Sequence, residues 1–148
     1  WQSERCVSVW QGAKQAKGRQ RWQATALQAA KQARRARVPE IGEARDTRRL
    51  ADWVGRTVRG GGVVLVLHEE AGTAISTAME SLGLPAPEEV PPVLAVVVGP
   101  EGGISPEETA VLEAAGAMTV RLGPHVMRTA SAGPVALAVL AHASGLWE

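Results

Sequence analysis

The sequence has 148 residues, of which 45% are hydrophobic, which is typical of a globular protein with a buried core. No apolar run is long enough to span a bilayer. The single cysteine, Cys6, excludes an internal disulfide and a cysteine-rich zinc site, so a reducing cytoplasm is the default compartment. The chain begins with Trp1 rather than Met, which suggests a piece of a longer protein.

The net charge of +1 hides a strong asymmetry. Residues 1–60 hold 14 of the 16 Lys and Arg and 5 of the 15 Asp and Glu, a net charge of +9. Residues 61–148 hold the other 2 Lys and Arg and the other 10 Asp and Glu, a net charge of −8. An arginine-rich half indicates a surface that faces phosphate, hence RNA or DNA. The alternative is an ordinary solvated face.

The first half of the sequence predicts a short strand, a loop, a long helix and a short helix. In chain order these are Glu4–Trp10, residues 11–18, Arg19–Ala36 and Arg48–Val54. The strand is predicted from alternation of side chains, and the long helix from its richness in Ala, Gln, Arg and Lys. Pro39 ends the long helix because it disfavours helical backbone at the preceding residue.

The second half predicts three strands that alternate with three helices. The strands are Val63–Leu67, Leu94–Val98 and Met118–Leu122, and the helices are Thr73–Leu82, Pro106–Ala115 and Ser131–Leu146. Pro134 is expected to interrupt the last helix near its start, and residues 83–92 form a proline-rich loop. Strands that are apolar on both faces indicate an α/β fold with a parallel sheet covered by helices on both sides.

The stretch GPEGGISPEE joins the second of these strands to its helix. Ser105 is suited to cap the helix, Pro106 to its first position, and Glu108 to complete a capping box. This helix start therefore carries its own anions, which argues against a phosphate site there. The glycine fingerprints of P-loop and dinucleotide-binding proteins are also absent from the sequence.

Three loops follow the three strands and are expected to meet at one edge of the sheet, where ligands of open α/β sheets bind. The glycines of residues 99–103 allow close approach of the backbone, and Glu101 adds one negative charge, which suits a neutral or cationic ligand. The alternative is a tight turn without a ligand. Arg128 is one of only two basic residues in the acidic half, and its ordinary role would be capping or ion pairing.

No catalytic or metal-binding motif of the common kinds accompanies these loops. His68, His125 and His142 lack the spacing of metal ligands, so we expect them to be structural and predict no metal. No activated serine or cysteine nucleophile and no pair of carboxylates stands out, and we expect Glu69–Glu70 and Glu88–Glu89 to be solvated.

Three stretches of the sequence are distinctive: GPEGGISPEE, LGPHVMRTASA, and ERC followed by RWQATALQAAKQARRARVPEI. They resemble the RsmE family, and the resemblance covers nearly the whole chain. Members of that family use S-adenosylmethionine to methylate N3 of one uridine, uracil 1498, in 16S rRNA of the small ribosomal subunit. The resemblance implies the SPOUT methyltransferase fold, an α/β domain with a C-terminal deep trefoil knot, and a homodimer that is not bound to a membrane.

The resemblance also implies roles for individual residues. Arg128 is the expected catalytic residue, which positions the uracil or stabilises its N3 anion. The basic helix would bind rRNA backbone through Arg19, Arg21, Arg34, Arg35 and Arg37. The residues expected to bind the methyl donor are Leu67, His68, Glu69, Gly99, Pro100, Glu101, Gly102, Gly103, Leu122, Gly123, Val126, Met127 and Arg128.

The sequence departs from the family in two respects. Many members have Glu where this chain has Ala130, so no side chain is an obvious base for the N3 proton, which leaves solvent, a substrate phosphate or a second subunit. By the resemblance, we expect the first strand–helix unit of the catalytic domain and the N-terminal PUA-like RNA-binding domain of the family to lie outside this sequence. The alternatives are a non-catalytic RNA-binding module that kept the fold and a nucleotide-binding enzyme of Rossmann type.

Overall fold

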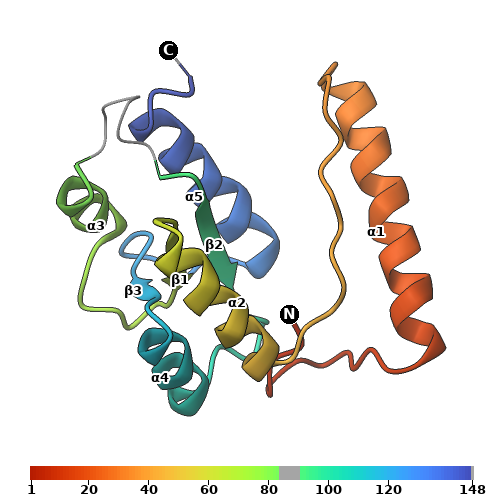
Figure 1. The fold of residues 1–148 in the computed structure, drawn as a ribbon, viewed down its shortest axis with the longest axis horizontal. Coiled ribbons are helices and arrows are strands. Elements are labelled where there is room, and N and C mark those ends of the chain that lie inside the picture. The colour runs from red at the N-terminus through yellow and green to blue at the C-terminus, as the bar shows by residue number, and fades with distance from the viewer. Residues whose placement is uncertain (84–90, 148) are drawn as a thin grey trace.

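The computed structural model describes residues 1–83 and 91–147 (Figure 1). The helices in these residues are α1 (Ala13–Gln32), α2 (Thr47–Arg59), α3 (Ile75–Ser81), α4 (Pro106–Ala114) and α5 (Thr129–Ala143). The strands are β1 (Val63–Leu67), β2 (Leu94–Val98) and β3 (Met118–Val120). From residue 63 onward, strands and helices alternate as predicted. None of these helices combines the length and the apolar character needed to cross a membrane.

Within the described residues the sheet has three parallel strands in the order β2-β1-β3. Val63 of β1 lies opposite Leu94 of β2, and Leu65 of β1 lies opposite Met118 of β3. β1 is therefore central, which explains why its sequence is apolar on both faces. The prediction of a parallel sheet is confirmed.

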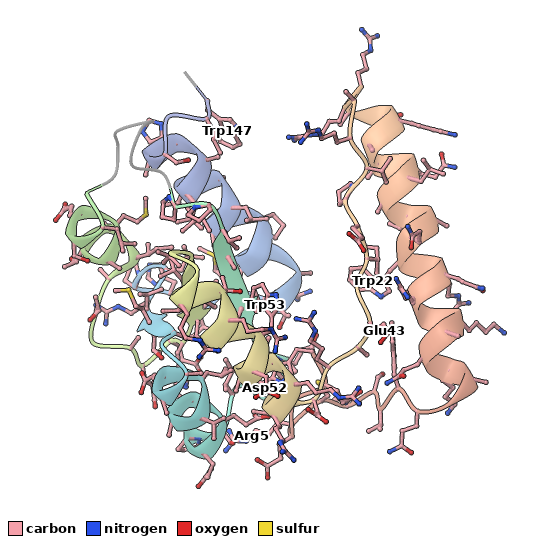
Figure 2. The ribbon with its side chains drawn as sticks, in the orientation of Figure 1. Arg5, Trp22, Glu43, Asp52, Trp53 and Trp147 are labelled. Carbon is pink, nitrogen blue, oxygen red and sulfur yellow. The ribbon has the colours of Figure 1, made fainter. Side chains whose placement is uncertain are left out.

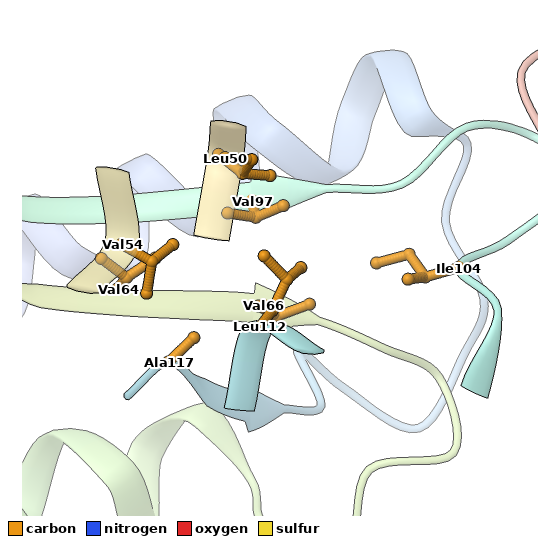
Figure 3. Close-up of a cluster of buried hydrophobic side chains, with 8 residues drawn as sticks. All are labelled: Leu50, Val54, Val64, Val66, Val97, Ile104, Leu112 and Ala117. Atoms are coloured by element: carbon orange, nitrogen blue, oxygen red, sulfur yellow. The ribbon is translucent and has the colours of Figure 1, made fainter. Parts of the chain in front are cut away.

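Helices cover both faces of this sheet. On one face, α2 and α4 bury a cluster made of Leu50, Val54, Val64, Val66, Val97, Ile104, Leu112 and Ala117 (Figure 3). On the other, α3 and α5 bury a cluster made of Leu65, Ile75, Ala78, Met79, Val120, Ala136 and Leu140. The predicted α/β layering is thus confirmed, and each face has its own apolar core.

The N-terminal segment is not the strand that its alternation predicts. Residues 4–10 contain no strand, and the polar groups of this segment are bonded through a side chain instead. The Trp10 N–H donates to Oε1 of Gln2 (3.0 Å), and Nε2 of Gln2 donates to the Ser8 carbonyl (3.1 Å). Alternation makes a strand only where a neighbouring strand offers its backbone, and no described strand lies beside these residues.

The long helix lies earlier in the chain than predicted. α1 begins at Ala13, inside the expected loop, and ends at Gln32. Gly12, with φ of 54°, turns the chain into the helix, and Arg34, with φ of 53°, turns it out. The Arg35 N–H donates to the Ala30 carbonyl (2.9 Å), which is the longer of the two hydrogen bonds of a Schellman motif. The helix therefore ends several residues before Pro39.

Other element boundaries differ from prediction by smaller amounts. α2 extends to Arg59 instead of Val54, and α3 and β3 are shorter than predicted. The prediction that Pro134 interrupts the last helix is wrong, because α5 runs through it from Thr129 to Ala143. Most of the predicted proline-rich loop, with Glu88–Glu89, lies outside the described residues.

The predicted capping box of α4 is confirmed and also ties distant segments together. Ser105 Oγ accepts from the Glu108 N–H (3.2 Å), and Glu108 Oε2 accepts from the Ser105 N–H (3.4 Å). The other oxygen of Glu108, Oε1, accepts from the Glu4 N–H (2.9 Å) and from Thr47 Oγ1 (2.6 Å). This buried carboxylate therefore joins the N-terminal segment to the starts of α2 and α4.

Candidate functional site

The loops that follow β1, β2 and β3 enclose a cavity of about 640 Å³ at the carboxyl ends of the strands. We call it the strand-end cavity; its lining is Leu67, His68, Glu69, Val98, Gly99, Pro100, Glu101, Gly103, Ile104, Arg121, Leu122, Gly123, His125, Val126, Met127, Arg128, Thr129, Ala130 and Ala132. All the residues expected to bind the methyl donor are brought together here except Gly102. Their shared location is as predicted, and their binding role stays a prediction.

The loop after β2 folds tightly against the start of α4. A Cβ added to Gly99 would stand 2.6 Å from Cγ1 of Ile104, closer than any side chain tolerates. Gly103 has φ of 76°, which favours glycine, and its N–H donates to the Pro100 carbonyl (2.9 Å). These two glycines let the backbone of the loop form a wall of the cavity without side chains in the way.

Gly102 faces the N-terminal segment instead of the cavity. A Cβ at Gly102 would stand 3.0 Å from both Cβ and the carbonyl oxygen of Arg5. Nη1 of Arg5 also donates to the Gly102 carbonyl (3.4 Å). Sequence reasoning gave Arg5 no role, although it lies in the ERC motif that contributed to the resemblance. Arg5 thus packs against the side of the loop that faces away from the cavity.

The loop after β1 wraps around the end of β3. On one side, the His68 N–H donates to the Val120 carbonyl (3.0 Å). On the other side, the Arg121 N–H donates to the Thr73 carbonyl (2.8 Å), and the Ile75 N–H donates to the Arg121 carbonyl (2.9 Å). The chain at residues 120–121 therefore passes between the two ends of segment 68–75.

Charges of both signs line the cavity. Glu69 and Glu101 are exposed carboxylates, and Arg121 and Arg128 are exposed guanidinium groups. Within residues 1–83 and 91–147, Arg128 makes neither a side-chain cap of α5 nor an ion pair, so the ordinary roles considered for it are not found. Its guanidinium group remains available to a ligand.

The side chain of His68 has a defined hydrogen-bond role at the cavity. Its Nδ1 accepts from the Glu70 N–H (3.2 Å), so the neutral imidazole carries its proton on Nε2. Among the described residues, no group of three His, Cys, Asp or Glu side chains is close enough to hold a metal ion.

Several residues of the cavity were not identified from the sequence as site residues. Ala130 carries no functional side chain, but its carbonyl is distinctive: Pro134, four residues later, has no N–H to donate to it. The position of Pro134 in the sequence was a signal for this feature once α5 was known to start at Thr129. Val98 at the end of β2 and Ile104 before α4 also line the cavity. The remaining ones, among them Arg121, His125 and Thr129, lie in the loop after β3 or at the start of α5, where the backbone path decides which side chains face the cavity.

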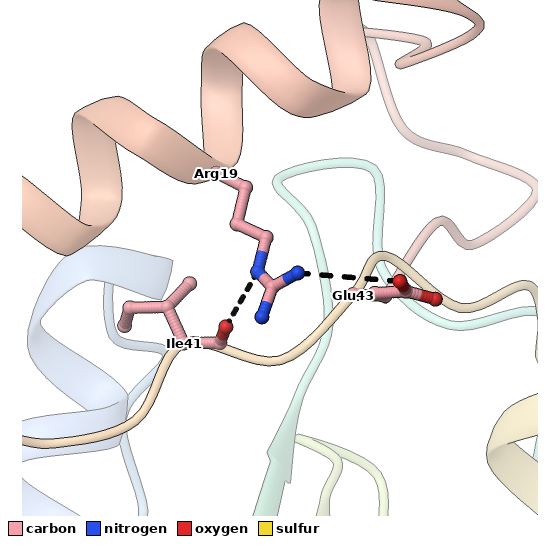
Figure 4. A network of polar contacts seen from close by, with 3 residues as sticks. All are labelled: Arg19, Ile41 and Glu43. Atoms are coloured by element: carbon pink, nitrogen blue, oxygen red, sulfur yellow. Dashed lines mark hydrogen bonds and ion pairs between the residues drawn. The ribbon is translucent and has the colours of Figure 1, made fainter.

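The residues predicted to bind RNA lie away from this cavity, on or just after α1, which stands beside the sheet (Figure 1). Arg21, Arg34, Arg35 and Arg37 are exposed. Arg19 is different, because its Nε donates to the Ile41 carbonyl (2.8 Å) and its Nη1 lies 4.0 Å from Oε1 of Glu43 (Figure 4). Four of the five arginines therefore have guanidinium groups without an ion-pair partner in residues 1–83 and 91–147.

Residues 1–141 match the model of a protein family described as RNA methyltransferase domain. The chain is 44% identical to the ribosomal RNA small subunit methyltransferase E of Mycobacterium bovis, in an alignment that covers 100% of this chain and 53% of that protein. The chain thus spans about half the length of this curated relative.

Two solved structures have the same fold. One is described as a methyltransferase of Legionella pneumophila with its cofactor S-adenosylmethionine bound; the TM-score is 0.77 at 29% identity, covering 96% of this chain and 53% of that one. The other is ribosomal RNA small subunit methyltransferase E of Neisseria gonorrhoeae bound to S-adenosylmethionine, with a TM-score of 0.76 at 24% identity, covering 96% and 52%.

Proposed function

The chain belongs to the family of RNA methyltransferase domains, and from this membership we propose that it is the catalytic part of an S-adenosylmethionine-dependent methyltransferase. Its proposed substrate is 16S rRNA of the small ribosomal subunit, which would place its activity in the cytoplasm. The observation that carries the proposal is the strand-end cavity, which gathers the glycine loop, apolar side chains and Arg128 in one place. The 44% sequence identity with the mycobacterial small subunit methyltransferase supports the same substrate.

The residues of the strand-end cavity fit S-adenosylmethionine, which supplies an electrophilic methyl group on a sulfonium cation. The volume lies within the range of roughly 300–1,000 Å³ found for small-molecule sites. Glu69 and Glu101 provide negative charge for a cation, and Val126 and Met127 provide apolar surface. A nucleoside diphosphate fits less well, because the backbone N–H groups at the start of α4 that could bind phosphate are already capped by Ser105 and Glu108.

The proposed reaction is methylation at N3 of one uridine, uracil 1498 in the family. N3 loses its proton and bonds to the methyl carbon, while the bond from that carbon to sulfur breaks. The negative charge of the uracil anion spreads onto O2 and O4, where the guanidinium group of Arg128 donates hydrogen bonds to it. Ala130 has no titratable side chain, so the proton leaves to another group.

The arginines on and after α1 are the proposed contacts to rRNA backbone. Four of them, Arg21, Arg34, Arg35 and Arg37, are exposed. They form no ion pair with any residue that the structure describes, so they can bind phosphate. Arg19 acts differently in this proposal: it holds segment 41–43 beside the helix and adds positive charge to the surface.

The trefoil knot and the homodimer of the family are also proposed for this chain. The knot is supported by the position of residues 120–121, which lie between the two ends of segment 68–75 and are hydrogen-bonded to both. The homodimer is supported by the exposure of three large apolar side chains, Val135 and Leu137 on α5 and Val126 beside the cavity, because an interface would remove them from water.

The proposal is tested by calorimetric titration with S-adenosylhomocysteine, followed by transfer of labelled methyl groups to small ribosomal subunits that lack the modification. We expect micromolar binding, a free energy of roughly −8 kcal/mol. Binding of RNA without binding of S-adenosylhomocysteine would instead identify a non-catalytic RNA-binding module.

Arg128→Ala tests the catalytic role. We expect methyl transfer to fall by about 100- to 1,000-fold, the loss typical of one donor that stabilises a developing anion, with an unchanged circular dichroism spectrum. Arg59→Ala, a change of an exposed arginine on α2 outside the cavity, serves as the control and should leave turnover unchanged. Full turnover of Arg128→Ala would remove this residue from the mechanism.

A further inference from the structure

Arg121 lines the strand-end cavity, and the proposed function leaves it without a role. It directly follows β3 and is exposed. Residues 61–148 contain one other basic side chain, that of Arg128, which the proposed function assigns to the uracil. A second guanidinium group in a small-molecule cavity is suited to an anionic group of the ligand, because it donates several hydrogen bonds in a fixed plane.

The backbone of Arg121 is fixed by the segment that returns from β1. Arg121 pairs in parallel with Ala74. Its N–H donates to the Thr73 carbonyl (2.8 Å), and its carbonyl accepts from the Ile75 N–H (2.9 Å). The position from which the Arg121 side chain leaves the backbone is therefore set relative to the cavity, and only its side-chain torsions remain to be ordered by a ligand.

The two arginines reach the cavity from opposite faces of the sheet. Val120 and Leu122 pack into the cluster under α3 and α5, and side chains alternate along an extended segment, so Arg121 points to the other face. That face is covered by α2 and α4, and Ile104 of its cluster lines the cavity. Arg128 is the N-cap residue of α5, on the face of Val120. The two guanidinium groups are therefore placed to contact different parts of a ligand.

The guanidinium group of Arg121 has no charged or aromatic partner among residues 1–83 and 91–147. Other arginines near the sheet do have partners within the chain. Nη1 of Arg5 donates to the Gly102 carbonyl (3.4 Å), and the guanidinium carbon of Arg45 lies 5.6 Å from the centre of the Trp53 ring (Figure 2). The positive charge of Arg121 is thus available to a ligand in the cavity.

The charges around the cavity match an amino-acid group better than a polyanion. Glu69 and Glu101 line the same cavity, and residues 61–148 carry a net charge of −8, so a phosphate chain would be repelled there. S-adenosylmethionine ends in an amino acid. Its ammonium and sulfonium groups suit the two carboxylates, and its α-carboxylate is its one anionic group, which a guanidinium group can bind through two parallel hydrogen bonds.

We propose that Arg121 binds the α-carboxylate of the methyl donor. The inference rests on the proposed function, because it presumes S-adenosylmethionine in the strand-end cavity. It gives the two guanidinium groups separate tasks: Arg121 holds the amino-acid end of the donor, and Arg128 contacts the uracil. It also makes Arg121 a specificity residue, which favours ligands that keep the carboxylate over adenosyl compounds that lack it.

The test is calorimetric titration with two ligands that differ only in this carboxylate. They are S-adenosylhomocysteine and its decarboxylated analogue, S-adenosyl-3-thiopropylamine. We expect Arg121→Ala to weaken the binding of S-adenosylhomocysteine about 10-fold, the low end for hydrogen bonds to charged groups because Arg121 is exposed. The analogue should bind Arg121→Ala at least as tightly as it binds the unaltered chain, because its net positive charge gains nothing from Arg121. Arg121→Lys, which keeps the charge without the planar pair of donors, should recover part of the affinity.

The control is Arg59→Ala, which removes an exposed arginine of α2 outside the cavity and should change neither affinity. If the unaltered chain binds neither ligand, the proposed function fails. If Arg121→Ala weakens both ligands by the same factor, Arg121 shapes the cavity without binding the carboxylate; this result, or unchanged binding of both, overturns the inference alone. Loss of affinity for single-stranded RNA with unchanged affinity for S-adenosylhomocysteine would assign Arg121 to phosphate, which also overturns it.

Discussion

Two regions of the molecule are stabilised by different forces. The first is the sheet with its covering helices, residues 47–147, and the second is the arm formed by residues 1–46. In the described part of the first region, β1 lies between two apolar clusters and carries three fully buried residues. In the arm, α1 is 20 residues long and buries only Ala30. The arm is attached mainly by hydrogen bonds of residues 1–5 to Thr47, Gly102 and Glu108.

This difference separates stability from charge. The region that buries apolar surface has a net negative charge, with 6 basic and 10 acidic residues, and the arm, which buries little, carries 10 of the 16 basic residues. If the arm binds RNA as proposed, its arginines stay in water until the RNA binds, so the same surface cannot also supply a core. Substitutions in the two regions should therefore affect different measurements.

The largest effect on stability is expected from Leu112→Ala. Leu112 is 0% exposed in the cluster between the sheet and α4, so its truncation removes apolar burial and leaves a cavity. We expect the free energy of unfolding to fall by about 2–5 kcal/mol in urea titration. The matched change in the arm, Leu27→Ala at a site that is 40% exposed, should stay within about 0.5 kcal/mol. Equal losses at both sites would show that α1 packs against a core.

An intermediate effect is expected from Gly99→Ala. The new methyl group would stand 2.6 Å from Ile104 and force the loop of the strand-end cavity to move, at a cost of about 1–3 kcal/mol. We expect weaker binding of S-adenosylhomocysteine in calorimetry together with this loss of stability. Gly123→Ala adds the same methyl group where nothing lies within 4 Å, and its unfolding free energy should be unchanged. Similar destabilisation by both would contradict the packing argument.

The smallest effect on stability is expected from Glu43→Gln in the arm. The Arg19–Glu43 pair is exposed and its atoms are 4.0 Å apart, so its loss should change the free energy of unfolding by less than about 0.5 kcal/mol. Removal of a negative charge beside the basic residues of α1 should nevertheless tighten RNA binding, measured by fluorescence-anisotropy titration with a labelled single-stranded RNA. Weaker RNA binding by Glu43→Gln would indicate that the position of Arg19 matters more than the net charge.

The elements that the sequence predicted best are those whose signals are local. The limits of β1 and β2 agree with prediction because each strand is a short run of apolar residues that follows a cluster of glycines or prolines. The start of α4 agrees as well, because its capping box acts across four residues. The three loops of the candidate site could be grouped in advance, because parallel strands place their carboxyl ends at one edge.

The predictions that were wrong concern residues whose structure depends on distant partners. Residues 4–10 alternate like a strand but have no strand to pair with in the described structure. The end of α1 was misplaced because Arg34 adopts a left-handed conformation that its residue type disfavours, and only the hydrogen bonds around it show why.

The apolar strands, the caps and the division of charge follow from the sequence alone, since each depends on residues within a few positions of one another or on composition. Three other features appear only in the folded chain: Glu108 accepts a hydrogen bond from Glu4, Arg5 packs against the loop at Gly102, and three tryptophans lie near Arg19. The first two of these contacts join residues about 100 positions apart. Their formation depends on how the arm returns to the sheet, and no local pattern of side chains encodes that path.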